Sequence, residues 1–224
     1  MGQRLTMAIY ENRNAEEPFA AVYLHWGAYS LSSLGEAAFL LKRLNGKTFQ
    51  IKSDWQKEII NIYLQRRYKP FYFDVLPNRK RRHGGIFSGD AAIAQRMWPD
   101  MELDTENADG NLGLVAISKS GIAALKEWSV GGVRIYLDTM TVDWDVFFQY
   151  PVSAWRQGND GNWRLSSDED YCISDQTWEN LLEVQTIGLT LPNITEFLEK
   201  DARKVSEDGF ALADSGHTVV EIIQ

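Results

Sequence analysis

The chain has little cysteine, histidine or proline, and the first two shortages each exclude a class of protein. Its 224 residues include one cysteine and three histidines. The single cysteine, Cys172, cannot form an internal disulfide, which favours a reducing compartment. The histidines show neither HxxxH nor HExxH spacing, so the sequence predicts no histidine-based zinc centre and no cofactor.

Long apolar runs are also lacking, as is a basic leader in front of one. No stretch approaches the roughly 18 apolar residues that a membrane-spanning helix needs. We therefore expect a cytoplasmic protein without a membrane partner. The formal net charge of −8 argues against duplex nucleic acid as a partner, because such binding depends on neutralising phosphates.

What the chain does have is the composition of a globular protein with many aromatic residues, among them eight tryptophans. Its length supports one hydrophobic core, so we predict a single domain over residues 1–224, with a division near 100–111 as the alternative. The strand patterns come as neighbouring hairpins with helices inserted between the groups. This order predicts an α+β fold whose sheet is mainly antiparallel.

Turn residues and periodicity predict the individual elements. Alternation over 5–11 and 20–26, with a polar loop between, indicates a first hairpin. Ser33-x-x-Glu36 predicts a capping box that opens a helix ending at Leu44, and Ser53 with Gln56 predicts a second. Further helices are expected over 88–98, 120–128, 174–184 and 194–206, and the last is opened by the capping pair Asn193 and Glu196. Further strands are expected over 71–76, 112–117, 133–137, 141–148 and 217–223, and on either side of the turn at 159–162.

The first candidate site is the turn His25-Trp26-Gly27-Ala28-Tyr29-Ser30. His25 shares a strand face with Tyr23, because side chains alternate along a strand. Backbone N–H groups at the start of the next helix would bind an anion, and His25 would act as an anion ligand or a general base. The alternative is structural, with His25 satisfied within the strand and a serine serving only as the helix cap.

Two segments resemble known proteins. The opening Met1-Gly-Gln-Arg-Leu5 and the segment His25-Trp26-Gly27-Ala28-Tyr29-Ser30 look like the start of small proteins encoded by bacteriophages and prophages of Gram-positive bacteria. The similarity is confined to the first part of the chain and includes no catalytic signature. It implies a phage protein in the host cytoplasm that interferes with host defence or metabolism.

The second candidate site is a basic run between a proline and two glycines. Cations beside glycines, whose N–H groups approach a ligand closely, form a phosphate cradle. Tyr72, just before the run, would stack on a base or a sugar. The alternative is a solvated basic loop. The residues of this predicted site are Arg79, Lys80, Arg81, Arg82, His83, Gly84 and Gly85.

Carboxylates form two further groups. Asp143 and Asp145 alternate with apolar residues, so both lie on the wet face of their expected hairpin. Such a pair suits acid/base or metal chemistry, although wet strand faces commonly carry carboxylates. The acidic segment 100–111 lacks the spacing of an EF-hand loop and is expected to be a solvated connection.

These features support three functional hypotheses. The leading one is a non-catalytic phage-type protein that captures an anionic, nucleotide-like small molecule or a host protein, and so counters host defence. Its contacts are the basic run, with His25, Tyr29 and Tyr72 nearby. The alternative is a hydrolase or transferase acting on a phosphorylated or amide substrate, with His25 as base and Asp143 or Asp145 in support. A purely protein-binding role through aromatic side chains is the third, and the oligomeric state is left open.

Overall fold

The structure is a computed structural model that describes residues 3–25, 27–65, 71–73, 113–146 and 152–200. Its large sheet has seven strands and its small sheet three, in the orders β10-β6-β5-β1-β2-β4-β3 and β7-β8-β9. The strands are β1 (Leu5–Tyr10), β2 (Ala20–Leu24), β3 (Phe71–Phe73), β4 (Gly113–Ala116), β5 (Gly131–Tyr136), β6 (Thr141–Asp145), β7 (Trp155–Gln157), β8 (Trp163–Leu165), β9 (Asp168–Ile173) and β10 (Leu189–Thr190).

The predicted α+β fold is confirmed. Both expected hairpins of the large sheet are present, β1 with β2 and β5 with β6. Antiparallel pairing also joins β2 to β4 and β10 to β6, whereas β1 pairs with β5 and β3 with β4 in parallel. The sheet is therefore mixed and mostly antiparallel. It takes strands from both sides of residues 100–111, which themselves lie outside the described residues.

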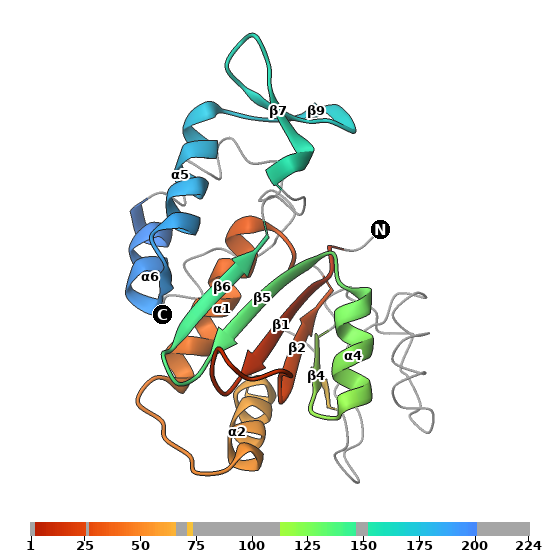
Figure 1. Cartoon of the computed structure of the whole chain (residues 1–224), viewed down its shortest axis with the longest axis vertical. Coiled ribbons are helices and arrows are strands. Elements are labelled where there is room, and N and C mark those ends of the chain that lie inside the picture. Colours follow the sequence, from red (N-terminus) through yellow and green to blue (C-terminus); the bar gives the residue numbers. More distant parts are fainter. Residues whose placement is uncertain (1–2, 26, 66–70, 74–112, 147–151, 201–224) are drawn as a thin grey trace.

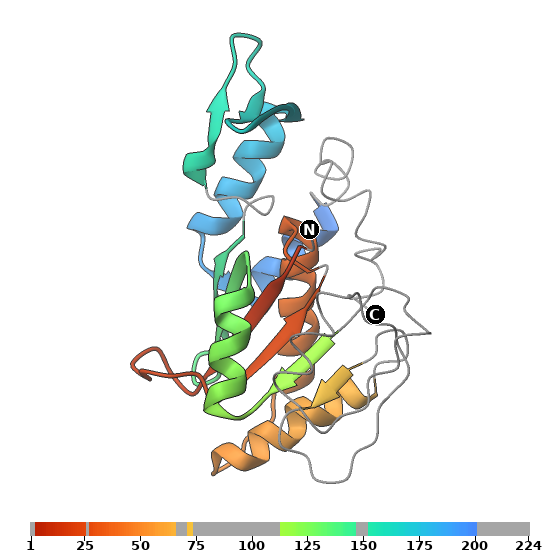
Figure 2. The same ribbon diagram turned by 90° about the vertical axis from the view of Figure 1, so that its right-hand side faces the viewer.

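The described helices are α1 (Ser30–Leu44), α2 (Lys52–Leu64), α4 (Lys119–Trp128), α5 (Asp175–Thr186) and α6 (Leu191–Lys200). Helices α1 and α4 lie on opposite faces of the large sheet (Figure 1 and Figure 2). α1 runs behind the sheet in Figure 1 and α4 in front of it, and the turned view in Figure 2 shows the sheet between them. No helix in these described ranges is long and apolar enough to cross a bilayer.

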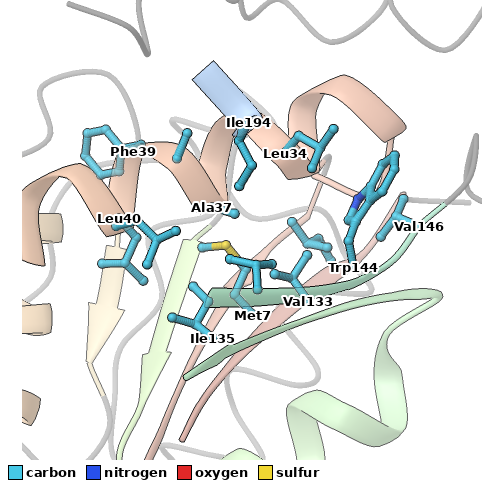
Figure 3. Close-up of a cluster of buried hydrophobic side chains, with 14 of the residues drawn as sticks. Met7, Leu34, Ala37, Phe39, Leu40, Val133, Ile135, Trp144, Val146 and Ile194 are labelled. Atoms are coloured by element: carbon cyan, nitrogen blue, oxygen red, sulfur yellow. The ribbon is translucent and has the colours of Figure 1, made fainter. Parts of the chain in front are cut away.

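The main core lies between the sheet and α1. Alternation along the strands turns one row of apolar side chains toward this helix, since Val22, Met7, Val133 and Trp144 are successive partners across four strands. All four are buried. Figure 3 shows Met7, Val133 and Trp144 facing side chains from the helices, and burying apolar surface of this kind is the main stabilising contribution to a fold. The helix side chains labelled there include Leu34, Ala37, Leu40 and Ile194.

The predicted capping box at Ser33 is wrong. α1 begins at Ser30, and its N-cap residue Tyr29 is extended, with no side-chain capping bond. The Ser33 hydroxyl instead donates to the Ser30 carbonyl oxygen at 2.9 Å and accepts from the indole Nε1 of Trp144 at 2.8 Å. Since Ser33 is fully buried, the distant indole takes the hydroxyl that the local pattern assigned to the cap.

Two other predicted caps are also wrong. The N-cap residue of α2 is Ile51, and Gln56 donates across to the Phe19 carbonyl at 2.7 Å. α6 begins at Leu191, so Asn193 lies inside it, where Nδ2 donates to the Gly188 carbonyl at 2.7 Å. Gln56 is therefore engaged by a residue distant in the chain and Asn193 by the segment just before its helix. Ser118 and Ser174 do cap their helices, accepting from Gly121 N and Thr177 N.

The small sheet packs on α5 through tryptophans. Trp163 stacks on Trp178 with the ring centroids 3.8 Å apart and the planes 5° apart. The expected hairpin around residues 159–162 is confirmed by the pairing of β7 with β8. The sequence missed β9, because its first half, Asp168 to Asp170, is exposed and acidic. Cys172 in β9 is partly buried.

Candidate functional site

The candidate site lies where β1 begins and β2 ends, on the sheet face that α4 covers. The antiparallel register pairs Leu5 with Leu24 and Thr6 with Tyr23. One step further, the same register puts Arg4 beside His25. Because alternate residues share a face, Arg4 and His25 lie on the same side of the sheet as Tyr23. This agrees with the prediction that His25 and Tyr23 share a strand face.

Aromatic contacts tie these residues to α4. The Tyr23 hydroxyl lies 3.0 Å from His25 Nδ1. The Tyr23 ring stacks on Trp128, the last residue of α4, with centroids 5.5 Å apart and planes 14° apart. The Arg4 guanidinium lies over the same indole, 4.9 Å from its centroid. These four side chains, Arg4, Tyr23, His25 and Trp128, are called the Arg4 cluster below.

The end of α4 is fixed in this position by Thr6. The Thr6 hydroxyl lies 3.1 Å from the Leu125 carbonyl oxygen and within hydrogen-bond reach of the hydroxyl of Ser129, the C-cap residue of α4. Ser129 in turn donates to the Leu125 carbonyl at 2.9 Å. Since Thr6 is buried, these bonds are protected from water. Trp128 is therefore held against the strands that carry Arg4 and His25.

Arg4 has a charge that no carboxylate in the described ranges neutralises. Its side chain makes no ion pair there, and its Nε is buried without a hydrogen-bond partner. Buried donors are nearly always paired, and an unpaired one costs about 1–3 kcal/mol. A guanidinium stays charged at every physiological pH and matches the geometry of carboxylates and phosphates. Within the described residues, the Arg4 cluster thus presents a cation that no carboxylate compensates, which suits an anion.

His25 is buried, with an exposed fraction of 8%. Its contact with Tyr23 has a consequence for its proton. When the phenol donates to Nδ1, the neutral imidazole carries its proton on Nε2. The Tyr23 contact thus helps to position the ring next to Arg4 and, where the phenol is the donor, sets the tautomer of the neutral ring.

Asp143 lies on the same sheet face but is bound elsewhere. It accepts from Arg13 Nη1 at 3.0 Å, Arg13 Nη2 at 2.8 Å and the Tyr136 hydroxyl at 2.8 Å. Partial burial raises the pKa of Asp143, but the hydrogen bonds from Arg13 and Tyr136 and the charge of Arg13 outweigh it, so the pKa lies below its ordinary value. The carboxylate is therefore ionised and engaged in an ion pair.

The structure does not bring His25 together with either predicted carboxylate. β1 and β5 separate β2 from β6, so three strand intervals, roughly 14 Å, lie between the strands of His25 and Asp143. Asp145 is exposed and lies opposite Gly132 of β5. A base and a supporting acid in hydrogen-bond contact would need a far shorter distance.

The other predicted site residues are dispersed. Tyr29 belongs to the core and is buried, with an exposed fraction of 5%. Tyr72 is in β3 at the edge of the sheet, two strands from Tyr23 in the same row. No group of three potential metal ligands gathers in the described part of the chain. The basic run lies outside the described residues, namely Arg79, Lys80, Arg81, Arg82, His83, Gly84 and Gly85.

Sequence reasoning missed Arg4 and Trp128. Arg4 precedes the first strand by one residue, and this position puts it opposite His25 once the hairpin register is known. That position is the sequence feature that could have identified it. Trp128 contacts this hairpin only because α4 lies across β1 and β2, a contact between segments more than 100 residues apart in the chain.

Comparisons with protein-family models, curated proteins and solved structures found no match to this chain.

Proposed function

We propose that this protein is a non-catalytic binding protein that captures a small anionic molecule at the Arg4 cluster. The observation that supports the proposal is the state of Arg4, whose guanidinium is fixed on Trp128, beside His25, with no carboxylate partner in the described ranges. Acidic residues outnumber basic ones in this chain by 31 to 23, so an arginine that pairs with no carboxylate of the described residues is a specific arrangement. Anions bind such sites through charge-assisted hydrogen bonds.

The positions of the ionisable groups favour a binding protein over an enzyme. The enzyme hypothesis takes His25 as base, with Asp143 or Asp145 in support. Asp143 is held by Arg13 and Tyr136, and both aspartates are on β6, three strand intervals from β2. General acid–base catalysis places its groups within hydrogen-bond reach of the same substrate atoms or of one another. The predicted catalytic set therefore has little support.

The nucleotide-like nature of the ligand and the role in countering host defence extend this proposal. In this proposal the basic run 79–85 supplies further cations that contact the anionic ligand. The resemblance of the N-terminal segments to phage proteins is the basis for the host-defence role. Both are part of the proposal and depend on Arg4 first binding an anion.

A host protein is the second candidate partner, and a charge imbalance favours it. Residues 152–200 contain nine carboxylates and three cations, a formal charge of −6. Two of the three cations are already paired, Arg164 with Asp160 and Lys200 with Glu196. A basic protein surface would complement this part of the chain, since opposite charges steer association.

Native mass spectrometry of the purified protein tests the leading proposal. We expect a small molecule of defined mass bound to the wild type, released unchanged by denaturation, and lost from Arg4→Gln. Arg156→Gln is the matched control, because Arg156 is an exposed arginine of β7 in the small sheet. Ligand retained in Arg4→Gln contradicts the site, and a released molecule that is chemically altered contradicts the non-catalytic role. A co-purifying polypeptide without a small molecule favours the host-protein candidate instead.

A further inference from the structure

An open strip of the sheet begins at Arg4 and crosses two neighbouring strands. Val130, just before β5, donates its backbone N–H to the Arg4 carbonyl at 2.9 Å, so it lies next to Arg4. Gly132 follows on β5, opposite Thr6 of β1 and Asp145 of β6. Alternation places Arg4, Gly132 and Asp145 on the same face of the sheet. The strip therefore has a cation at one end and a carboxylate at the other.

No side chain of the described residues occupies the middle of this strip. A Cβ built on Gly132 meets no atom within 4 Å, whereas one built on the preceding Gly131 meets Val146 at 3.0 Å and Ala28 at 3.2 Å. Val130 has an exposed fraction of 48%, which leaves an apolar surface beside the open position. Glycine in a strand interior weakens the strand and often marks a place where a ligand approaches closely. The open face at Gly132 thus leaves room for a flat group.

The carboxylate at the far end differs from its neighbour on the same strand. Asp143 is bonded by Arg13 and Tyr136, but Asp145 is exposed and makes no hydrogen bond or ion pair with any described residue. Ionised carboxylates only accept hydrogen bonds. A molecule that reaches Asp145 must therefore present donors there. The two strand intervals from Arg4 to Asp145 correspond to roughly 10 Å, which is longer than an inorganic phosphate ion.

Resting on the proposed function, we infer that the captured anion is a phosphorylated sugar, free or as part of a nucleotide. Its phosphate contacts Arg4, its ring lies over Gly132 against Val130, and its hydroxyls donate to Asp145. Two adjacent hydroxyls match the two oxygens of a carboxylate, as in the acidic residue that holds ribose in dinucleotide-binding folds. An ammonium group is the other donor class, which phosphoethanolamine tests separately below.

Calorimetric titration of the full chain tests this inference, with inorganic phosphate, ribose 5-phosphate, ribose and phosphoethanolamine as probes. We expect ribose 5-phosphate to bind at least about 10-fold more tightly than phosphate, because one or two hydrogen bonds to a charged group are added. Ribose alone should bind far more weakly, since it lacks the anion. Phosphoethanolamine should bind no more tightly than phosphate.

Two substitutions separate the parts of the strip. Gly132→Val fills the open position with a β-branched side chain that suits a strand, so we expect the variant to fold. It should abolish the gain in affinity, that is, the tighter binding of ribose 5-phosphate relative to phosphate. Gly132→Ala is the milder variant if the valine lowers the thermal midpoint, and should reduce the same gain. Asp145→Asn should reduce the gain about 10-fold and leave phosphate binding unchanged.

The outcomes distinguish this inference from the proposed function. Ribose 5-phosphate that binds no more tightly than phosphate, or a gain that persists in both Gly132→Val and Asp145→Asn, contradicts the inference while leaving anion capture intact. Phosphoethanolamine binding more tightly than ribose 5-phosphate contradicts the sugar assignment. Phosphate and ribose 5-phosphate that bind equally to wild type and Arg4→Gln contradict both proposals.

Discussion

Asp143 accepts hydrogen bonds from both terminal nitrogens of Arg13, at 3.0 and 2.8 Å. The same guanidinium lies over the ring of Tyr136, 4.4 Å from its centroid, and Tyr136 also donates to Asp143. Arg13 belongs to the connection between β1 and β2, whereas Tyr136 and Asp143 are on β5 and β6. The ion pair thus fastens this connection to the sheet and gives Asp143 a structural role.

The Arg13–Asp143 pair predicts a pH-dependent contribution to stability. The pKa of Asp143 is lowered in the folded protein, so the contribution is present above the ordinary carboxyl pKa and is lost as the pH falls through the lower, folded value. Arg13→Gln should lower the free energy of unfolding by about 1 kcal/mol or less at pH 7, because the pair is partly exposed. Urea unfolding at pH 7 and in strong acid measures this. A deficit that is equal at both pH values would show that the ion pair is not its cause.

Two adjacent serines of α1 should respond in opposite ways to replacement by alanine. Ser33→Ala leaves the buried Trp144 N–H without its acceptor, which should cost about 1–3 kcal/mol. The Ser32 hydroxyl is buried and has no hydrogen-bond partner among the described residues, so Ser32→Ala should leave the stability unchanged or raise it. Thermal and urea unfolding of both variants provide the comparison. Equal losses in the two variants would mean that the Ser32 hydroxyl does have a partner.

Gly27 should not tolerate a side chain. A Cβ at this position would lie 2.8 Å from Leu24 Cβ and 2.9 Å from Leu5 Cβ, both in the core. Gly27→Ala should therefore destabilise the fold by about 1–3 kcal/mol, the usual cost of overpacking. Gly132→Ala is the matched control, because its Cβ has open space and should change stability little. A Gly27→Ala variant as stable as Gly132→Ala would contradict the close approach.

The sequence predicted local structure better than pairing over long distances. The hairpins β1–β2 and β5–β6 were expected because alternation and turn residues specify neighbouring strands. The parallel pairing of β1 with β5 was not expected. The two-residue alternation of a strand indicates on which face of the sheet a side chain lies, but not which distant strand pairs with it. Two of the capping errors have the same origin, as Trp144 engages Ser33 from more than 100 residues away and Gln56 bonds to Phe19.

The candidate site was predicted only in part. The shared face of Tyr23 and His25 follows from strand alternation, and their contact confirms it. Arg4 was overlooked because a single arginine before a strand has no motif around it. Its significance depends on the register that sets it beside His25 and on the helix that brings Trp128 over it.

The thermal midpoint in increasing concentrations of phosphate, at constant ionic strength, tests anion capture at Arg4 most directly. A ligand that binds only the folded state raises the midpoint according to its concentration and affinity. We predict that phosphate raises the midpoint of the wild type and of Arg156→Gln alike, and that Arg4→Gln shows no such rise. A rise of the same size in Arg4→Gln, or none in the wild type, would contradict the assignment of Arg4 as the anion site.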